Sequence, residues 1–384
     1  MIFDKQNVMK KPFYQLAQKQ DVVRHFTPNW FTVVMGTGIL ALILPEFPFA
    51  KALLWQLGAS LWHFNTLLFL AFSALYAARW LLYPQEAKQI FSHPSMALFL
   101  GAIPMGLATV LNGFLKYGIA LYGDAAIQIA HALWLVDAVL AVGIGIVVPF
   151  CMFHKQEHQL QTMTAMWLLP IVACEVTATS GGLLLAYLEA GQHAVGILLA
   201  SYMLWGMSVL PAFGILTILM LRLALHKLPG KELAISGWLA LGPIGTGALA
   251  LLVLGAQAPQ VLAFIQLEQL GVFFQQAGIV ASLILLGFGL WWFAIAVLTT
   301  LKHAANDLPF NLGWWGLTFP LGVFTMAVLN LGHLLHISFI LNIGLALAAI
   351  LVMLWMMVMS RTLKGMYRGN LFFSPCLKTF LERE

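Results

Sequence analysis

The chain has 384 residues, of which 61% are hydrophobic and only 9% are charged. Soluble domains carry about 25% charged residues, so this composition excludes an ordinary soluble protein. The formal net charge of +5 reflects where the basic residues lie along the chain and does not indicate nucleic-acid binding.

The segment 1–24 is polar and mixed in charge. It lacks the short apolar core followed by small residues that a cleaved signal peptide has, so we expect a cytoplasmic N-terminal segment here. The three cysteines, Cys151, Cys174 and Cys376, have neither metal-ligand nor disulfide-framework spacing. The sequence therefore predicts no metal and no cofactor.

Apolar segments long enough for a membrane helix, about 20 residues, follow one another along the rest of the chain. They are too long and too uniformly apolar for barrel strands, which alternate over about ten residues. The ten segments span residues 26–45, 53–82, 95–117, 124–153, 162–189, 193–226, 233–255, 263–301, 312–332 and 336–360. The sequence predicts an all-α membrane protein with a transmembrane domain over residues 25–361 and a cytoplasmic tail over residues 362–384.

The basic residues indicate how these segments are oriented. Cytoplasmic loops of membrane proteins are enriched in lysine and arginine, and ten spans with both termini inside leave only Lys51 and Lys116 outside. The inner side then receives Lys5, Lys10, Lys11, Lys19, Arg24, Arg79, Lys88, Lys155, Arg222, Lys227, Lys231, Lys302, Arg361, Lys364, Arg368, Lys378 and Arg383. We expect a cell-membrane protein whose termini are both cytoplasmic.

The odd-numbered segments share a motif, seen in VVMGTGILAL, IPMGLATVL, LPIVACEVTAT, GPIGTGALAL and FPLGVFTMAVL. On this alignment one position holds Pro104, Pro170, Pro243 and Pro320, with Val34 in the first segment, and Gly36, Gly106, Gly245 and Gly322 follow two residues later. The aligned positions are 70, 66, 73 and 77 residues apart. A near-constant period indicates a repeated unit, here a helical hairpin used five times.

A proline inside a helix costs about 3 kcal/mol in water. Irregular backbone at membrane depth is tolerated only in packed protein or around a cavity. We therefore expect five kinked inner helices around a central pore and five outer helices facing lipid. The residues expected to line the pore are Gly36, Thr37, Gly38, Pro104, Gly106, Thr109, Pro170, Glu175, Thr177, Pro243, Gly245, Thr246, Gly322 and Thr325.

Two stretches, HFTPNWFTVVMGTGILAL at 25–42 and FNLGWWGLTFPLGVFT at 310–325, resemble the tellurite-resistance/dicarboxylate transporter family. The family includes yeast malic acid transporters, sulfite efflux pumps and slow-type anion channels of plants, and the resemblance covers about residues 24 to 360. It implies five hairpins around a pore, a homotrimer, and a phenylalanine of the ninth helix that occludes the lumen. The implied gate is Phe319, directly before Pro320; ordinary packing between helices is the alternative.

Glu175 is an acid in the middle of the fifth segment. An ionisable group inside the membrane is a functional-site hypothesis by default, and burial would favour its neutral form. It could carry a proton coupled to an anion, or it could be a protonated side chain that bridges two helices. The threonines could donate hydrogen bonds to a solute or bond their own preceding carbonyl groups.

The leading hypothesis from the sequence is transport of small anions, most plausibly C4-dicarboxylates such as malate or succinate. The alternative is a passive channel for small inorganic anions such as nitrate, chloride or sulfite, or a tellurite-resistance permease. The inner segments offer no arginine fork for a dicarboxylate, which weakens malate as the solute. No catalytic constellation supports an enzyme, and the expected partners are a small anion, the lipid bilayer and further copies of the chain.

Overall fold

The computed structural model describes residues 12–16, 18, 20–304 and 308–382. Five basic residues that the sequence assigned to the inner side, Lys5, Lys10, Lys11, Lys19 and Arg383, lie outside these ranges. Within the described ranges the chain is helical, without strands, and 10 helical spans are long and apolar enough to cross a membrane. The predicted all-α class and the ten spans are confirmed.

Each odd-numbered span, called an inner span below, is a short 3-10 helix that leads into an α-helix. The five pairs are η1 (Pro28–Trp30) with α2 (Phe31–Ile43), η4 (Ala97–Gly101) with α5 (Ala102–Gly113), η7 (Ala165–Leu168) with α8 (Leu169–Leu185), η8 (Lys231–Ala240) with α10 (Leu241–Ala263), and η9 (Leu312–Leu317) with α12 (Phe319–Leu335). The second inner span, the third span of the chain, continues through the π-helical turn η5 (Phe114–Gly118) into α6 (Ile119–Tyr122).

Each even-numbered span is one long helix, called an outer helix below. The outer helices are α3 (Lys51–Leu82), α7 (Ala125–His154), α9 (Gln192–His226), α11 (Glu268–Ala304) and α13 (Ser338–Arg368). In the most apolar stretch of each inner span 83% to 89% of the residues are buried, against 17% to 33% in the outer helices. The outer helices expose large apolar side chains such as Leu67, Met203 and Phe339, which suits contact with lipid.

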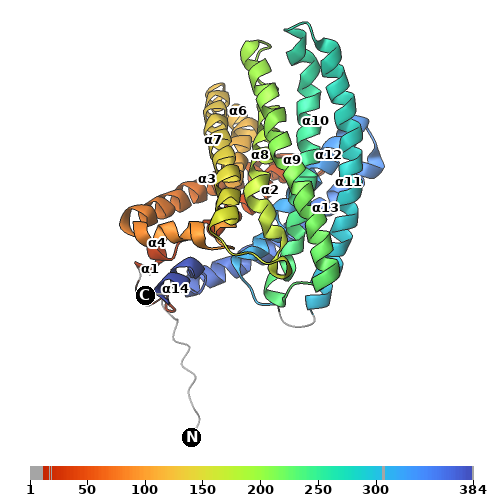
Figure 1. Ribbon diagram of the computed structural model, residues 1–384. Helices are drawn as coiled ribbons and strands as arrows, with labels where there is room; N and C mark the ends of the chain where they lie inside the picture. Colours follow the sequence, from red (N-terminus) through yellow and green to blue (C-terminus); the bar gives the residue numbers. More distant parts are fainter. Residues whose placement is uncertain (1–11, 17, 19, 305–307, 383–384) are drawn as a thin grey trace.

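The five inner helices form a closed ring. In ring order α2 contacts α5, α5 contacts α8, α8 contacts α10, α10 contacts α12, and α12 returns to α2. Each outer helix packs between two consecutive members, as α9 does against α8 and α10 and α11 does against α10 and α12 (Figure 1). The inner and outer roles expected of the odd and even spans therefore hold in the packing.

The aligned prolines lie in the first turn of their α-helices. Pro170 and Pro320 are the second residues of α8 and α12, and Pro104 and Pro243 are the third residues of α5 and α10. The first N–H groups of an α-helix have no intrahelical partner, so a proline there is well tolerated. This corrects the expectation of a proline break inside a continuous helix. The recurring irregularity is the change from 3-10 to α geometry.

The remaining elements connect the spans. They are α1 (Asp21–Arg24), η2 (Leu44–Glu46), α4 (Pro84–Lys88), η3 (Gln89–Ser92), η6 (Leu160–Thr162) and α14 (Pro375–Leu381). The helix α13 continues to Arg368, beyond the domain boundary expected at residue 361. Buried Arg79 of α3 donates to the backbone oxygen of Phe26 at 2.7 Å and to the Ser374 hydroxyl at 3.1 Å. The C-terminal segment is thereby fastened beside the start of the first inner span.

Candidate functional site

A large cavity opens at the end of the ring where all five inner spans begin. It has a volume of about 500 Å³, and we call it the vestibule. Its lining includes Thr32, Phe99, Met166, Ser236 and Trp315, one from each inner span, together with Asn370, Leu371, Phe373 and Pro375 of the C-terminal segment. Among the described residues that line it, Glu232 carries the only charged side chain.

A second cavity lies inside the ring, and we call it the chamber. Its volume is about 40 Å³. The lining is Ile39 and Leu42 of α2, Thr109 and Asn112 of α5, Val176, Thr179 and Leu183 of α8, Thr246 and Leu249 of α10, and Phe319, Val323 and Met326 of α12. All five inner helices thus enclose one common void, as the fivefold repeat predicts. The chamber lining contains no charged side chain among the described residues.

Phe319 lies between the vestibule and the chamber. Its side chain contributes to the lining of both cavities, and the residue is only 2% exposed. A smaller space of about 20 Å³ beside it is lined by Met35, Met105 and Gly242, among others. Phe319 is the first residue of α12 and is separated from the 3-10 helix η9 by Thr318 alone, so the junction between the two helix types determines where its ring points.

The other inner spans carry no aromatic residue at the position aligned with Phe319. The aligned residues are Val33, Ile103, Leu169 and Gly242. At Gly242 an added Cβ would meet a single neighbouring atom, at 3.9 Å, so this side of the ring of helices is open. Of the five aligned positions, only that of Phe319 therefore places an aromatic ring between the two cavities.

The glycines expected to line the pore lie at contacts between helices. A Cβ added to Gly245 would come within 2.5 Å of the Phe324 backbone, and one added to Gly322 would come within 2.5 Å of Ile39. Gly36, Gly38 and Gly106 likewise face neighbouring residues of the ring or of α3, and neither these glycines nor Pro104, Pro170 and Pro243 occur in the chamber lining. Their common function is close approach of the inner helices. Pro320 does line the vestibule.

The candidate threonines divide into two groups. Thr109 and Thr246 line the chamber. Thr37 accepts a hydrogen bond from the Trp355 indole of α13 at 3.2 Å, and Thr177 lies 2.7 Å from Asp137 of α7. Thr325, in turn, donates to the backbone oxygen of Leu321 at 2.7 Å. These three hydroxyls are used between or within helices.

Glu175 is fully buried, and neither carboxylate oxygen makes a hydrogen bond of good geometry, although the Ser208 hydroxyl of α9 is near enough to interact with the carboxyl group. A Cβ added to Gly247 of α10 would lie 3.6 Å from Oε2, so the carboxyl group points toward α10. Glu175 is absent from the linings of the vestibule and the chamber. This position resembles the bridging alternative more than a group on the solute path.

Sequence reasoning missed Asn112 and Thr179, which also line the chamber. A helical-wheel alignment of the inner spans could have found them, because Asn112 lies one turn after Thr109. The signal is weak, however, since almost every face of an inner helix is buried.

A polar cluster joins three inner spans at the end opposite the vestibule. The Lys116 ammonium lies 2.6 Å from Glu46 Oε1, and His333 Nε2 lies 3.7 Å from Glu46 Oε2. Glu46 ends the first inner span, Lys116 lies in the π-helical turn of the second, and His333 lies in the last turn of the fifth. The cluster places one basic side chain where the sequence predicts the outer side.

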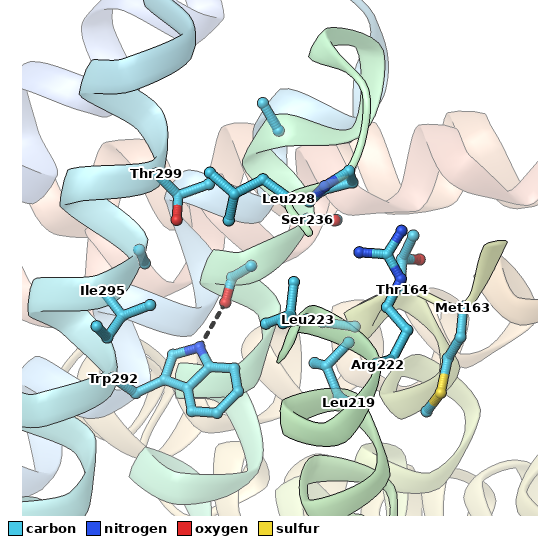
Figure 2. A pocket seen from close by; sticks show the side chains of 15 residues that line it. Met163, Thr164, Leu219, Arg222, Leu223, Leu228, Ser236, Trp292, Ile295 and Thr299 are labelled. Carbon is cyan, nitrogen blue, oxygen red and sulfur yellow. Dashed lines mark hydrogen bonds between the residues drawn. The ribbon is translucent and has the colours of Figure 1, made fainter. Parts of the chain in front are cut away.

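A further small pocket, with a volume of about 30 Å³, lies among α9, η8 and α11, away from the ring axis (Figure 2). Figure 2 shows Arg222 and Trp292 on its walls. Arg222 donates to the backbone oxygens of Gln161 and Lys227, at 2.7 and 2.6 Å, and Trp292 donates to that of Gly237 at 2.9 Å. Arg222 thereby fastens α9 to the connecting segments, and Trp292 fastens α11 to η8.

Comparisons with known proteins agree with this architecture. Residues 25–363 match the family described as voltage-dependent anion channel. The chain is 37% identical over 365 residues to the sulfite efflux pump of Arthroderma benhamiae, covering 93% of this chain and 96% of the relative. It is 28% identical over 355 residues to an uncharacterized transporter of Methanocaldococcus jannaschii, covering 92% and 97%. It is 23% identical over 366 residues to the malic acid transport protein of Schizosaccharomyces pombe, covering 91% and 80%.

Proposed function

The chain belongs to the voltage-dependent anion channel family, and on that basis we propose that it moves small inorganic anions of the sulfite class through the ring of inner helices. As a member of this family with ten apolar spans, it is a multi-pass membrane protein of anion transport. The observation that carries the proposal is the chamber, which is small, uncharged and enclosed by all five inner helices.

The size of the chamber favours a small anion. A volume of about 40 Å³ holds about three water-sized spheres, since one needs about 10–15 Å³. A C4-dicarboxylate is larger, and recognition of two carboxylates normally uses an arginine fork, which the chamber lining lacks among its described residues. The 37% identity to a sulfite efflux pump points the same way.

The positive charge at the vestibule end of the spans suits an anion that enters from the vestibule. The N-terminal ends of all five inner helices point to that cavity, and a helix N-terminus carries a partial positive charge. Arg24, Arg361 and Lys364 belong to the same end of the spans. By the enrichment of basic residues on the cytoplasmic side, the vestibule faces the cytoplasm, so export of the anion across the cell membrane is the proposed direction.

Phe319 is the proposed gate. Its nearly complete burial between the two cavities supports this role, because an anion cannot pass from vestibule to chamber while the ring stays there. Movement of the ring toward the space beside Gly242 is the proposed route of opening.

Transport of a C4-dicarboxylate is the second candidate, supported by the 23% identity to a malic acid transport protein. Coupling to a proton through Glu175 belongs with this candidate. The full burial of the carboxyl group supports coupling, and its absence from the cavity linings speaks against it. A homotrimer embedded in the bilayer is a further proposal, which rests on the family resemblance.

The deciding experiment is a panel of solutes in proteoliposomes that contain the purified protein. Sulfite, nitrate, chloride, malate and succinate are compared at two pH values, with and without an imposed proton gradient. We expect uptake of sulfite that follows the membrane potential and does not need the proton gradient. Uptake of malate that exceeds that of sulfite and collapses with the proton gradient would overturn the proposal in favour of the second candidate.

A further inference from the structure

One hydroxyl in the chamber has no protein partner. Thr246 is 1% exposed and lines the chamber, and no hydrogen-bond partner lies within reach of its Oγ1 atom. Buried hydroxyl groups nearly always have a partner. Because Thr246 forms part of the chamber wall, a molecule inside the chamber is the partner that this hydroxyl can take.

The other chamber hydroxyls are already used. Thr109 donates to the backbone oxygen of Gly106 at 2.8 Å and accepts from Asn65 at 3.1 Å. Thr179 donates to the backbone oxygen of Glu175 at 3.0 Å. The hydroxyl of Thr246 is therefore the one in the chamber lining whose proton is free among the described residues.

A second polar group in the lining is also available. The side-chain oxygen of Asn112 is buried and has no hydrogen-bond partner. The oxygen and nitrogen of an amide exchange places by rotation about the terminal torsion, so Asn112 can turn either a donor or an acceptor toward the chamber. The rest of the lining is apolar except for Thr109 and Thr179, whose hydroxyl groups already donate to backbone oxygens.

We propose that Thr246 and Asn112 form an anion-binding subsite on the far side of Phe319, and that this subsite selects oxyanions such as sulfite. The inference rests on the proposed transport of small anions. The Thr246 hydroxyl and the Asn112 amide each donate a hydrogen bond to an oxygen of the anion. Neutral donors replace part of its water shell, and without a fixed positive charge the anion is held weakly enough to leave, as conduction requires.

The subsite favours oxyanions because separate oxygens can accept from donors on two different helices. Chloride is a single atom, so the removal of one donor weakens its binding less than it weakens the binding of an oxyanion. Removal of the Thr246 hydroxyl should thus change selectivity as well as affinity. The uncharged lining distinguishes this subsite from the arginine forks that bind carboxylates tightly.

The test uses Thr246→Val, which keeps the shape and removes the hydroxyl, and Thr246→Ser, which keeps the hydroxyl. The matched control is Thr325→Val, because that buried hydroxyl bonds its own helix and does not line the chamber. Sulfite and chloride uptake are measured as a function of concentration in proteoliposomes. Folding of each variant is checked by its elution from a sizing column and by thermal unfolding in detergent.

A hydrogen bond to a charged group is worth enough that its loss weakens binding roughly tenfold. We expect Thr246→Val to raise the KM for sulfite by about that factor, to reduce chloride uptake by a smaller factor, and so to lower the sulfite-to-chloride ratio. Thr246→Ser and Thr325→Val should behave like the native protein, and Asn112→Leu should shift the ratio in the same direction as Thr246→Val.

The inference is overturned if folded Thr246→Val keeps the native KM and the native ratio, which would mean that water alone occupies the chamber. It is equally overturned if Thr325→Val lowers the ratio as much as Thr246→Val does. Failure of the native protein to take up either anion would instead refute the proposed function, so the two failures are distinguishable.

Discussion

The ammonium of Lys116 lies 2.6 Å from the carboxylate of Glu46, so an ion pair joins the far ends of the first and second inner spans. The Lys116 side chain is 37% exposed and that of Glu46 is 18% exposed. Exposed pairs contribute at most about 1 kcal/mol to stability. The pair therefore contributes little to stability. Its more important effect is that the Lys116 charge balances the Glu46 charge at this end of the ring.

Replacement of Lys116 by glutamine leaves the charge of Glu46 unbalanced at this end of the ring. We expect slower sulfite transport at low ionic strength, by about two- to threefold, and a native rate at high ionic strength, because salt screens exposed charges. Thermal unfolding should change little. The measurement is uptake at several salt concentrations, and Lys51→Gln serves as the control because Lys51 begins an outer helix. An equal effect at all salt concentrations would contradict the electrostatic explanation.

Truncation of Phe319 should open the passage. Phe319→Ala removes the ring between vestibule and chamber, so we expect anion flux to rise by at least tenfold. Phe324→Ala is the matched control: Phe324 is fully buried one turn and a half further on and packs against Gly245 and Gly289. Loss of that ring should cost about 3–5 kcal/mol of stability without opening the path. Flux that rises equally in both variants would argue for general loosening and against a gate.

Filling the space beside the ring should keep it closed. Gly242 lines the small cavity next to Phe319, and Gly242→Val would occupy that volume. We expect less flux than in the native protein and no loss of membrane insertion. Gly287→Val on α11, where an added Cβ meets nothing within 4 Å, controls for the substitution itself. The double variant Gly242→Val and Phe319→Ala separates two explanations. If its flux is as low as that of Gly242→Val alone, the valine blocks the path directly, and restricted movement of the Phe319 ring does not explain the low flux.

The role of Glu175 can be separated from its packing. Glu175→Gln keeps the shape and removes the titratable proton, and Asp137→Asn does the same for the buried acid of α7 that contacts Thr177. If Glu175 bridges helices, sulfite uptake at two pH values stays close to native in both variants. A selective loss of pH-dependent uptake in Glu175→Gln would establish proton coupling.

His93 should make the start of the second inner span sensitive to acid. Its Nδ1 accepts from the backbone N–H groups of Ser95 and Met96, at 3.2 and 3.1 Å. Burial lowers the pKa of His93 below its ordinary value of 6.5. As the pH falls, His93 therefore binds its proton at a lower pH in the folded state than in the unfolded state. The contribution of His93 to the free energy of unfolding is fully present above about pH 6.5 and decreases below it.

Thermal unfolding of the native protein and of His93→Asn, compared at pH 7.5 and pH 5.5, measures this effect. Asparagine keeps an acceptor for the backbone N–H groups and does not titrate. We expect the variant to lose less stability on acidification than the native protein does. Equal losses in both would show that other groups cause the acid sensitivity.

Several features of this protein follow from the amino-acid sequence alone. Composition determines a helical membrane protein, because 9% charged residues cannot cover a soluble surface. The length of the apolar runs predicts the ten spans, and the repeated proline and glycine positions predict which spans are buried. The position of Phe319 could be selected through the family resemblance of the motif around it, and its function as a gate stays a prediction.

Only the tertiary structure decides which side chains reach the central passage. Thr109 and Thr246 line the chamber, whereas Thr37, Thr177 and Thr325 face other helices. An inner helix is buried on all sides, so its sequence shows no polar face that would reveal the direction of the axis. The vestibule also needs five segments far apart in the chain and the C-terminal residues to meet at one place. Rotation of a helix by a fraction of a turn exchanges a lining residue for a packed one, and contacts with neighbouring helices alone determine that rotation.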